Sequence, residues 1–134
     1  MKLLRGITLA ITLTSTSLSS AVEMNGIFYC LSEAAAGIDN GTSSTYKPSE
    51  KFTVKVDKNS GWMTLTGGVN DMFEITGINN SNAFANADGG VFKGLVLQGN
   101  SQGSFDFVLR NSYVDPSSLK VIAVYLETGK CQKW

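Results

Sequence analysis

The stretch GIFYCLSEAAAGID, residues 26–39, decides much of the fold, because it places Cys30 in an aromatic, strand-like run near the start of the chain. The other cysteine, Cys131, lies in LETGKCQKW, residues 126–134. In an exported chain an even cysteine count indicates disulfide bonding rather than metal or redox chemistry, and two cysteines allow one internal pairing. We therefore predict a Cys30–Cys131 disulfide that links the first and last strands. A free thiol and an intermolecular bridge are the alternatives.

The first 21 residues predict export. Lys2 and Arg5 precede the apolar and hydroxyl run GITLAITLTSTSL, and Ser19 and Ala21 have the small side chains that suit a cleavage site. We expect a signal peptide at residues 1–21 and a single β domain at residues 22–134, large enough to bury roughly two-thirds of its unfolded surface. An N-terminal strand or helix of the mature fold is the alternative. No later segment has the roughly 20 apolar residues of a membrane span, so none is expected.

The mature chain is weakly acidic. The signal segment holds two of the eleven Lys and Arg residues and none of the eleven Asp and Glu residues, so nine basic residues face eleven acidic ones. Arg110 is the only arginine that remains. This balance argues against nucleic acid or an anionic membrane as the partner. The partner is therefore expected to be a protein or a small ligand, and the sequence specifies neither its identity nor the oligomeric state.

Short alternating runs, separated by clusters of Gly, Asn, Asp and Ser, recur along the mature chain. KFTVKVDK, residues 51–58, alternates most clearly, with apolar Phe52, Val54 and Val56 on one face. Strands are predicted at residues 26–32, 51–58, 62–66, 72–78, 91–98, 104–110 and 120–127, and a short one is possible at 83–86. Short connections favour antiparallel neighbours. We predict an all-β fold, a small antiparallel meander barrel of about 7–8 strands, with a β-sandwich as the alternative.

The segment from Glu33 to Glu50 interrupts this pattern. Residues 33–36 could form one helical turn that ends at Gly37, and DNGTSSTYKPSE, residues 39–50, has the composition of a surface loop. Long loops in compact domains are commonly functional. We therefore expect a loop here, and it is the first candidate for a recognition segment.

Residues 121–126 are apolar on both faces of the predicted last strand. Such a strand either lies in the centre of the fold with both faces covered or presents an apolar patch to a partner. The covered arrangement is the favoured one, because large exposed patches are uncommon on monomers.

No catalytic, metal or cofactor motif is found. The chain contains no histidine, which removes the commonest general base and metal ligand. Its carboxylates are scattered singly, and neither a nucleophile elbow nor a phosphate loop is present. We therefore expect no catalytic residues, no metal, no cofactor and no enzymatic activity. Tyr46 in the long segment, Trp134 at the end and the single arginine, Arg110, are the candidate partner-binding residues.

The start FYCLSEAAAGI, the following KFTVKVD strand and the terminal ETGKCQKW resemble a group of small exported bacterial proteins. In that group an aromatic-X-Cys strand comes early and Gly-X-Cys closes the chain. The resemblance implies a periplasmic or secreted bacterial location and implies no activity. A small disulfide-bearing barrel is also similar to the exported inhibitors of lysozyme. Their Ser-Gly-Ala-Arg-Tyr loop is not found, and Arg110 stands instead in VLRNSY.

These observations favour a non-enzymatic exported binding protein. Its ligand would be a small apolar compound or a sugar inside the barrel, or else a protein partner held by residues 33–50. The alternatives are a structural or surface-assembly subunit, with residues 121–126 as its interface, and an inhibitor of a secreted enzyme.

Overall fold

The structure is a computed structural model, and it describes residues 23–134 except 49–50, 68–69 and 88–92. The expected signal peptide at residues 1–21 lies outside the described residues. Nine strands and no helix are found in the part that the structure describes. They are β1 (Gly26–Asp39), β2 (Thr42–Tyr46), β3 (Lys51–Asp57), β4 (Trp62–Thr66), β5 (Asp71–Ile78), β6 (Asn82–Ala87), β7 (Lys93–Gly99), β8 (Phe105–Val114) and β9 (Val121–Lys133).

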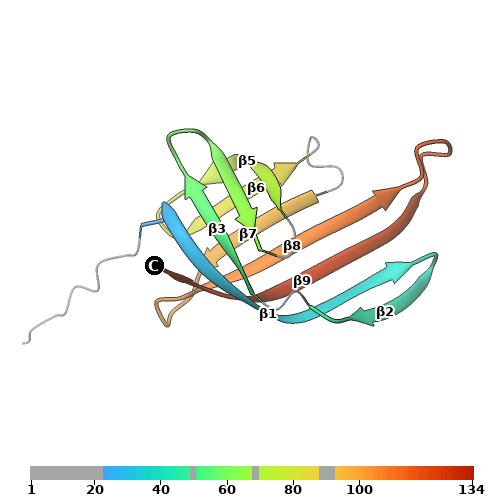
Figure 1. Cartoon of the computed structure of the whole chain (residues 1–134), viewed down its shortest axis with the longest axis horizontal. Coiled ribbons are helices and arrows are strands. Elements are labelled where there is room, and N and C mark those ends of the chain that lie inside the picture. Colours follow the sequence, from blue (N-terminus) through green and yellow to red (C-terminus); the bar gives the residue numbers. More distant parts are fainter. Residues whose placement is uncertain (1–22, 49–50, 68–69, 88–92) are drawn as a thin grey trace, which may run out of the picture.

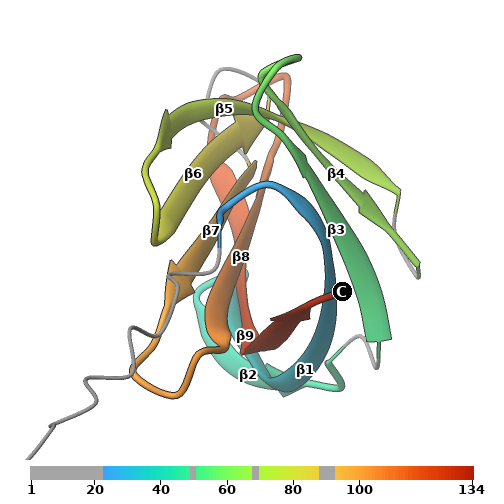
Figure 2. The ribbon, with the colours of Figure 1, turned by 90° about the vertical axis from the view of Figure 1, so that its left-hand side faces the viewer.

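The strands form one antiparallel sheet in the order β2-β1-β3-β4-β5-β6-β7-β8-β9, and β1 also pairs with β9. This last pairing closes β1 and β3–β9 into an eight-stranded barrel, while β2 pairs with β1 outside the ring. Figure 2 shows the strands wound around the closed ring. The predicted antiparallel meander barrel is therefore confirmed, and the sandwich alternative is wrong.

The predicted disulfide is present and joins the two strands that close the barrel. Cys30 of β1 and Cys131 of β9 are direct cross-strand partners, 101 residues apart in sequence, and both are buried. Aromatic pairs surround the bridge inside the barrel, with Phe28 edge-on to Phe105 at 5.1 Å between ring centroids. Apolar side chains from all eight barrel strands complete this core, which explains the period-two alternation of the sequence.

The segment that we expected to be a loop, Glu33–Glu50, is mostly strand, and the helical turn at residues 33–36 is not formed. Residues 34–39 continue β1 along β9, and residues 42–46 form β2. Pairing with two neighbouring strands outweighs the helix propensity of three alanines, because one isolated helical turn is marginal. Asn40 and Gly41 connect β1 to β2, and both have positive φ, 48° and 81°. Positive φ at both central residues is the requirement of a two-residue type I′ hairpin.

Four strand segments extend beyond the barrel as an arm. We define the arm as residues 34–39 of β1, all of β2, residues 112–114 of β8, which lie beyond the last β7 pairing at Asn111, and residues 121–127 of β9. Figure 1 shows these segments projecting past the ends of β3–β7. Strand β8 runs four residues further than predicted, into the arm, whereas β9 extends past its expected end at residue 127 inside the barrel. The possible strand at 83–86 is confirmed as part of β6, and residues 91 and 92 lie outside the described part of β7.

One apolar face of β9 is exposed. Ala123 is buried on the inner face of the arm, whereas Ile122 and Leu126 on the outer face are 43% and 47% exposed. The favoured expectation for residues 121–126, that both faces are covered, is therefore wrong for the outer face. No second layer of described strands lies against this face of the arm, so its side chains are exposed (Figure 1). In the described part of the chain, no helix is long and apolar enough to cross a membrane.

Candidate functional site

We expected a small ligand inside the barrel, and the described side chains there are closely packed. Large side chains occupy it, and Phe28, Phe73, Phe107, Met63 and Leu95 each have less than 2% of their surface exposed. The cavities that the described residues line on the outer surface and in the arm are therefore the candidates.

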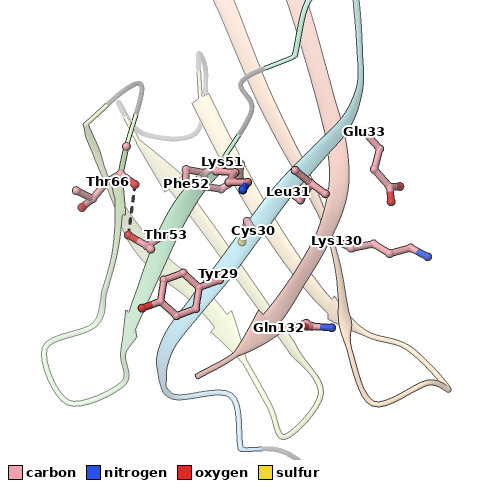
Figure 3. A pocket seen from close by; sticks show the side chains of 11 residues that line it. Tyr29, Cys30, Leu31, Glu33, Lys51, Phe52, Thr53, Thr66, Lys130 and Gln132 are labelled. Carbon is pink, nitrogen blue, oxygen red and sulfur yellow. Dashed lines mark hydrogen bonds between the residues drawn. The ribbon is translucent and has the colours of Figure 1, made fainter.

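A groove of about 680 Å³ lies on the outside of the barrel, over β1. This volume is within the roughly 300–1,000 Å³ range of small-molecule sites. Strands β1, β3, β4 and β9 contribute most of the lining (Figure 3). The lining residues are Tyr29, Cys30, Leu31, Glu33, Lys51, Phe52, Thr53, Thr66, Gly67, Lys130 and Gln132.

The alternation of β1 explains the apolar floor of the groove. Cys30 points into the barrel, so its neighbours Tyr29 and Leu31 point outward, and they are 49% and 50% exposed. The register then fixes what stands beside them. Leu31 is the cross-strand partner of Lys51 on β3 and of Lys130 on β9. An apolar row on β1 therefore runs between two strands that carry lysines.

Three charged side chains lie along the groove. Lys51 points toward β1 in Figure 3, while Lys130 and Glu33 extend along the opposite side. A β-bulge between Ser32 and Ala34 turns Glu33 outward. Neither lysine forms an ion pair with any residue that the structure describes. The described part of the groove therefore has a net positive charge, with two lysines and one glutamate.

Neutral polar groups surround the apolar floor. The Thr53 hydroxyl donates a hydrogen bond to the Thr66 carbonyl oxygen at 3.3 Å, which ties β3 to β4 beside the groove (Figure 3). Gln132 is the cross-strand partner of Tyr29 on the β9 side and is exposed. The site is thus an open, mainly apolar groove with hydroxyl, amide and ammonium groups at its margins. Such a surface can bind a ligand.

The three predicted partner-binding residues do not lie together. Trp134 is 82% exposed and contacts Tyr29 edge-on at 5.8 Å, next to the groove. Tyr46 belongs to β2 in the arm, on the inner face of the sheet. Arg110 is half-buried on the outer face of β8. Its guanidinium lies over Gly94 of β7, 3.7 Å from the place that a Cβ atom would take there. Only Trp134 therefore adjoins the groove.

Sequence reasoning missed Leu31, Lys51 and Lys130. The alternation of residues 26–32 already places Leu31 on the face opposite Cys30. The missing information is the register, because only the pairing of β1 with β3 and β9 brings the lysines to either side of this leucine.

Among the described residues, no group of three or more His, Cys, Asp or Glu side chains could hold a metal ion. Comparison of the chain with models of known families, with curated proteins and with solved structures gives no match.

Proposed function

We propose that this chain is a non-enzymatic exported binding protein that holds a small amphipathic anion in the groove over β1. The observation that carries the proposal is the exposed pair Tyr29 and Leu31, bracketed by a lysine on each neighbouring strand. The fold does not need these two apolar side chains on the outside, because the core is complete without them.

The chemistry of the groove selects the ligand class. An apolar body of the ligand would cover Tyr29 and Leu31, and each fully buried CH₂ group contributes roughly 0.8 kcal/mol. A carboxylate or sulfonate would lie within reach of Lys51, whose side chain points toward β1 (Figure 3). Glu33 on the far side disfavours a dianion. The ligand therefore carries one negative charge and an extended apolar part.

The disulfide supports an exported location, since such bonds persist in oxidising compartments. It also holds β1 and β9 together directly beneath the groove, because Cys30 is among the lining residues. A preformed groove binds with less loss of conformational entropy than a flexible one.

Calorimetric titration with dodecanoate and with dodecyltrimethylammonium tests the proposal, because the two probes share an alkyl chain and differ in charge. We expect dodecanoate to bind more tightly. Replacing Lys51 with glutamine should lower the affinity for dodecanoate about two- to fivefold, which is the range expected for an exposed ion pair. The loss of affinity should be smaller at high salt, because salt screens exposed charges. Leu31→Ser should weaken both probes.

Lys58→Gln is the matched control, because Lys58 is a surface lysine that lies in the turn after β3 and pairs with Glu23 at 3.9 Å. It should leave both affinities unchanged. Equal affinity of the two probes, or an equal loss in Lys51→Gln and Lys58→Gln, would refute the charge-selective groove.

A second function, an assembly subunit, is favoured by one observation. The outer face of the arm exposes Ile38, Ile122 and Leu126, and β2 is an edge strand that pairs only with β1. A second copy could pair with the edge of β2 and continue the sheet. Sedimentation would then show a mass that rises with concentration and returns to that of the monomer in Leu126→Lys. A monomer at all concentrations would exclude this function.

A further inference from the structure

Three of the four tyrosines of the chain meet on the inner face of the arm, near the mouth of the barrel. The ring of Tyr125 on β9 packs edge-on against the rings of Tyr46 on β2 and Tyr113 on β8, with 4.6 Å and 5.6 Å between ring centroids. A cavity of about 190 Å³ lies against this cluster. The cluster is on the opposite side of the sheet from the groove, so it forms a separate place for a ligand.

The position of Tyr125 depends on a glycine opposite it. Gly37 of β1 is its cross-strand partner, and a Cβ atom at this position would lie 2.9 Å from the Tyr125 ring. The absence of a side chain at Gly37 therefore lets the ring lie close to the sheet. The pKa of Tyr125 is raised to about 12, mainly by a hydrogen bond with the Tyr46 hydroxyl and, to a smaller extent, by burial. The cluster is thus a built aromatic surface and not a chance contact of flexible side chains.

Hydrogen-bond donors and acceptors both line the same cavity. Asn111 contributes a side-chain oxygen that is buried and has no hydrogen-bond partner among the described residues. Glu127, which accepts a hydrogen bond from the Ser32 hydroxyl, and Lys47 add a carboxylate and an ammonium. A ligand hydroxyl that donates to Asn111 would supply the hydrogen bond that this oxygen lacks among the described residues.

We infer that this cavity binds one ring of a neutral sugar. Its volume corresponds to roughly six water molecules at about 30 Å³ each, which suits a single sugar ring and is too small for a drug-sized ligand. The apolar C–H face of a pyranose matches a tyrosine ring, and its hydroxyls can donate to Asn111 and Glu127 and accept from Lys47. One positive and one negative side chain balance, which favours an uncharged ligand.

NMR titration of the ¹⁵N-labelled full mature chain with methyl β-D-glucopyranoside and N-acetylglucosamine tests this inference. Cyclohexanol is the comparison probe, because it has a similar ring and one hydroxyl. We expect at least one sugar, and not cyclohexanol, to shift the amide signals of residues 44–47, 109–113 and 123–127. The groove variant Lys51→Gln should bind the sugar as the wild type does, so failure of the groove proposal would not affect this result.

Two variants separate binding from folding. Tyr113 is 53% exposed, so Tyr113→Ala should fold, and its affinity for the sugar should be about tenfold lower. Asn111→Leu removes an unsatisfied buried acceptor, so it should retain or raise the unfolding midpoint and still weaken the sugar about five- to tenfold. Tyr29→Ala, in the other exposed aromatic pair, is the control and should bind normally.

Three results would overturn the inference. The first is the absence of shifts with either sugar, and the second is that cyclohexanol shifts the same amides equally. The third is that Asn111→Leu binds the sugar as tightly as the wild type.

Discussion

Removing the Cys30–Cys131 bridge should cost a large fraction of the stability of the domain. The bridge closes a loop across a sequence separation of 101 residues, and both side chains are buried. Loop-closure entropy for a loop of this length corresponds to about 4.7 kcal/mol at 25 °C. The net stability of a domain is about 5–15 kcal/mol, so the bridge provides between a third and nearly all of it. For a chain of this length, that loss lowers the melting temperature by roughly 20 °C.

Urea unfolding of three samples measures this effect: the oxidised protein, the same protein after reduction, and the double variant Cys30→Ala/Cys131→Ala. We expect the unfolding midpoint to fall in the second and third samples by similar amounts. The slope of the free energy of unfolding against urea should rise, because an uncrosslinked chain exposes more surface when it unfolds. A loss below about 1 kcal/mol in both samples would show that β1–β9 pairing alone closes the barrel, and would refute the entropy argument.

Three further results are expected. Gly129→Ala should destabilise the fold by about 1–3 kcal/mol in urea unfolding, because the new Cβ would clash with the Leu31 carbonyl oxygen of β1. Gly77→Ala is the control, because the nearest atom to its new Cβ would be 3.7 Å away. The amide of Ser60 donates to Asp57 and lowers the pKa of that carboxyl below 3.8. Its stabilising contribution is present above the unfolded-state pKa of about 3.9 and is lost as the pH falls toward the folded-state pKa, so the urea midpoint should depend less on acid pH in Asp57→Asn. Leu119 has φ 56° and is 79% exposed, so Leu119→Gly should raise the free energy of unfolding by about 0.5–1 kcal/mol. An unchanged free energy of unfolding in urea would contradict the strain.

The barrel could be predicted from the sequence because its information is local. The alternation of residues 51–58 and the turn clusters between runs define the strands, and the two cysteines indicate which strands meet. The arm could not be predicted from the same criteria. Residues 34–36 are three alanines with high helix propensity, and they become strand through pairing with β9 and, at residues 35 and 36, with β2. One local signal was available, since the Asn40-Gly41 dipeptide is typical of a two-residue hairpin and would have indicated β2.

The candidate site was less accessible to prediction than the fold. Trp134 was identified because it is an aromatic residue beyond the last predicted strand, and it does adjoin the groove. Tyr46 was identified in a presumed loop and lies instead in a tyrosine cluster. In sequence, 67 residues separate Tyr46 from Tyr113, and 12 separate Tyr113 from Tyr125. Register creates both the cluster and the row of lysines beside Leu31, and register depends on turn geometry and bulges that alternation alone does not specify.

Strands β1 and β9 show how one alternating pattern serves two purposes. Inside the ring, the inward residues Cys131 and Gly129 are buried in the core. Past the mouth, the same row of β9 continues with Glu127 and Tyr125, which no second sheet covers, and the row that would otherwise be core becomes an open inner face. The outward row of β1 contributes nothing to that core, and its apolar Leu31 is half exposed to water. Exposure of apolar side chains has no stabilising role in the fold, and the ligand that we propose for the groove would remove Leu31 from water.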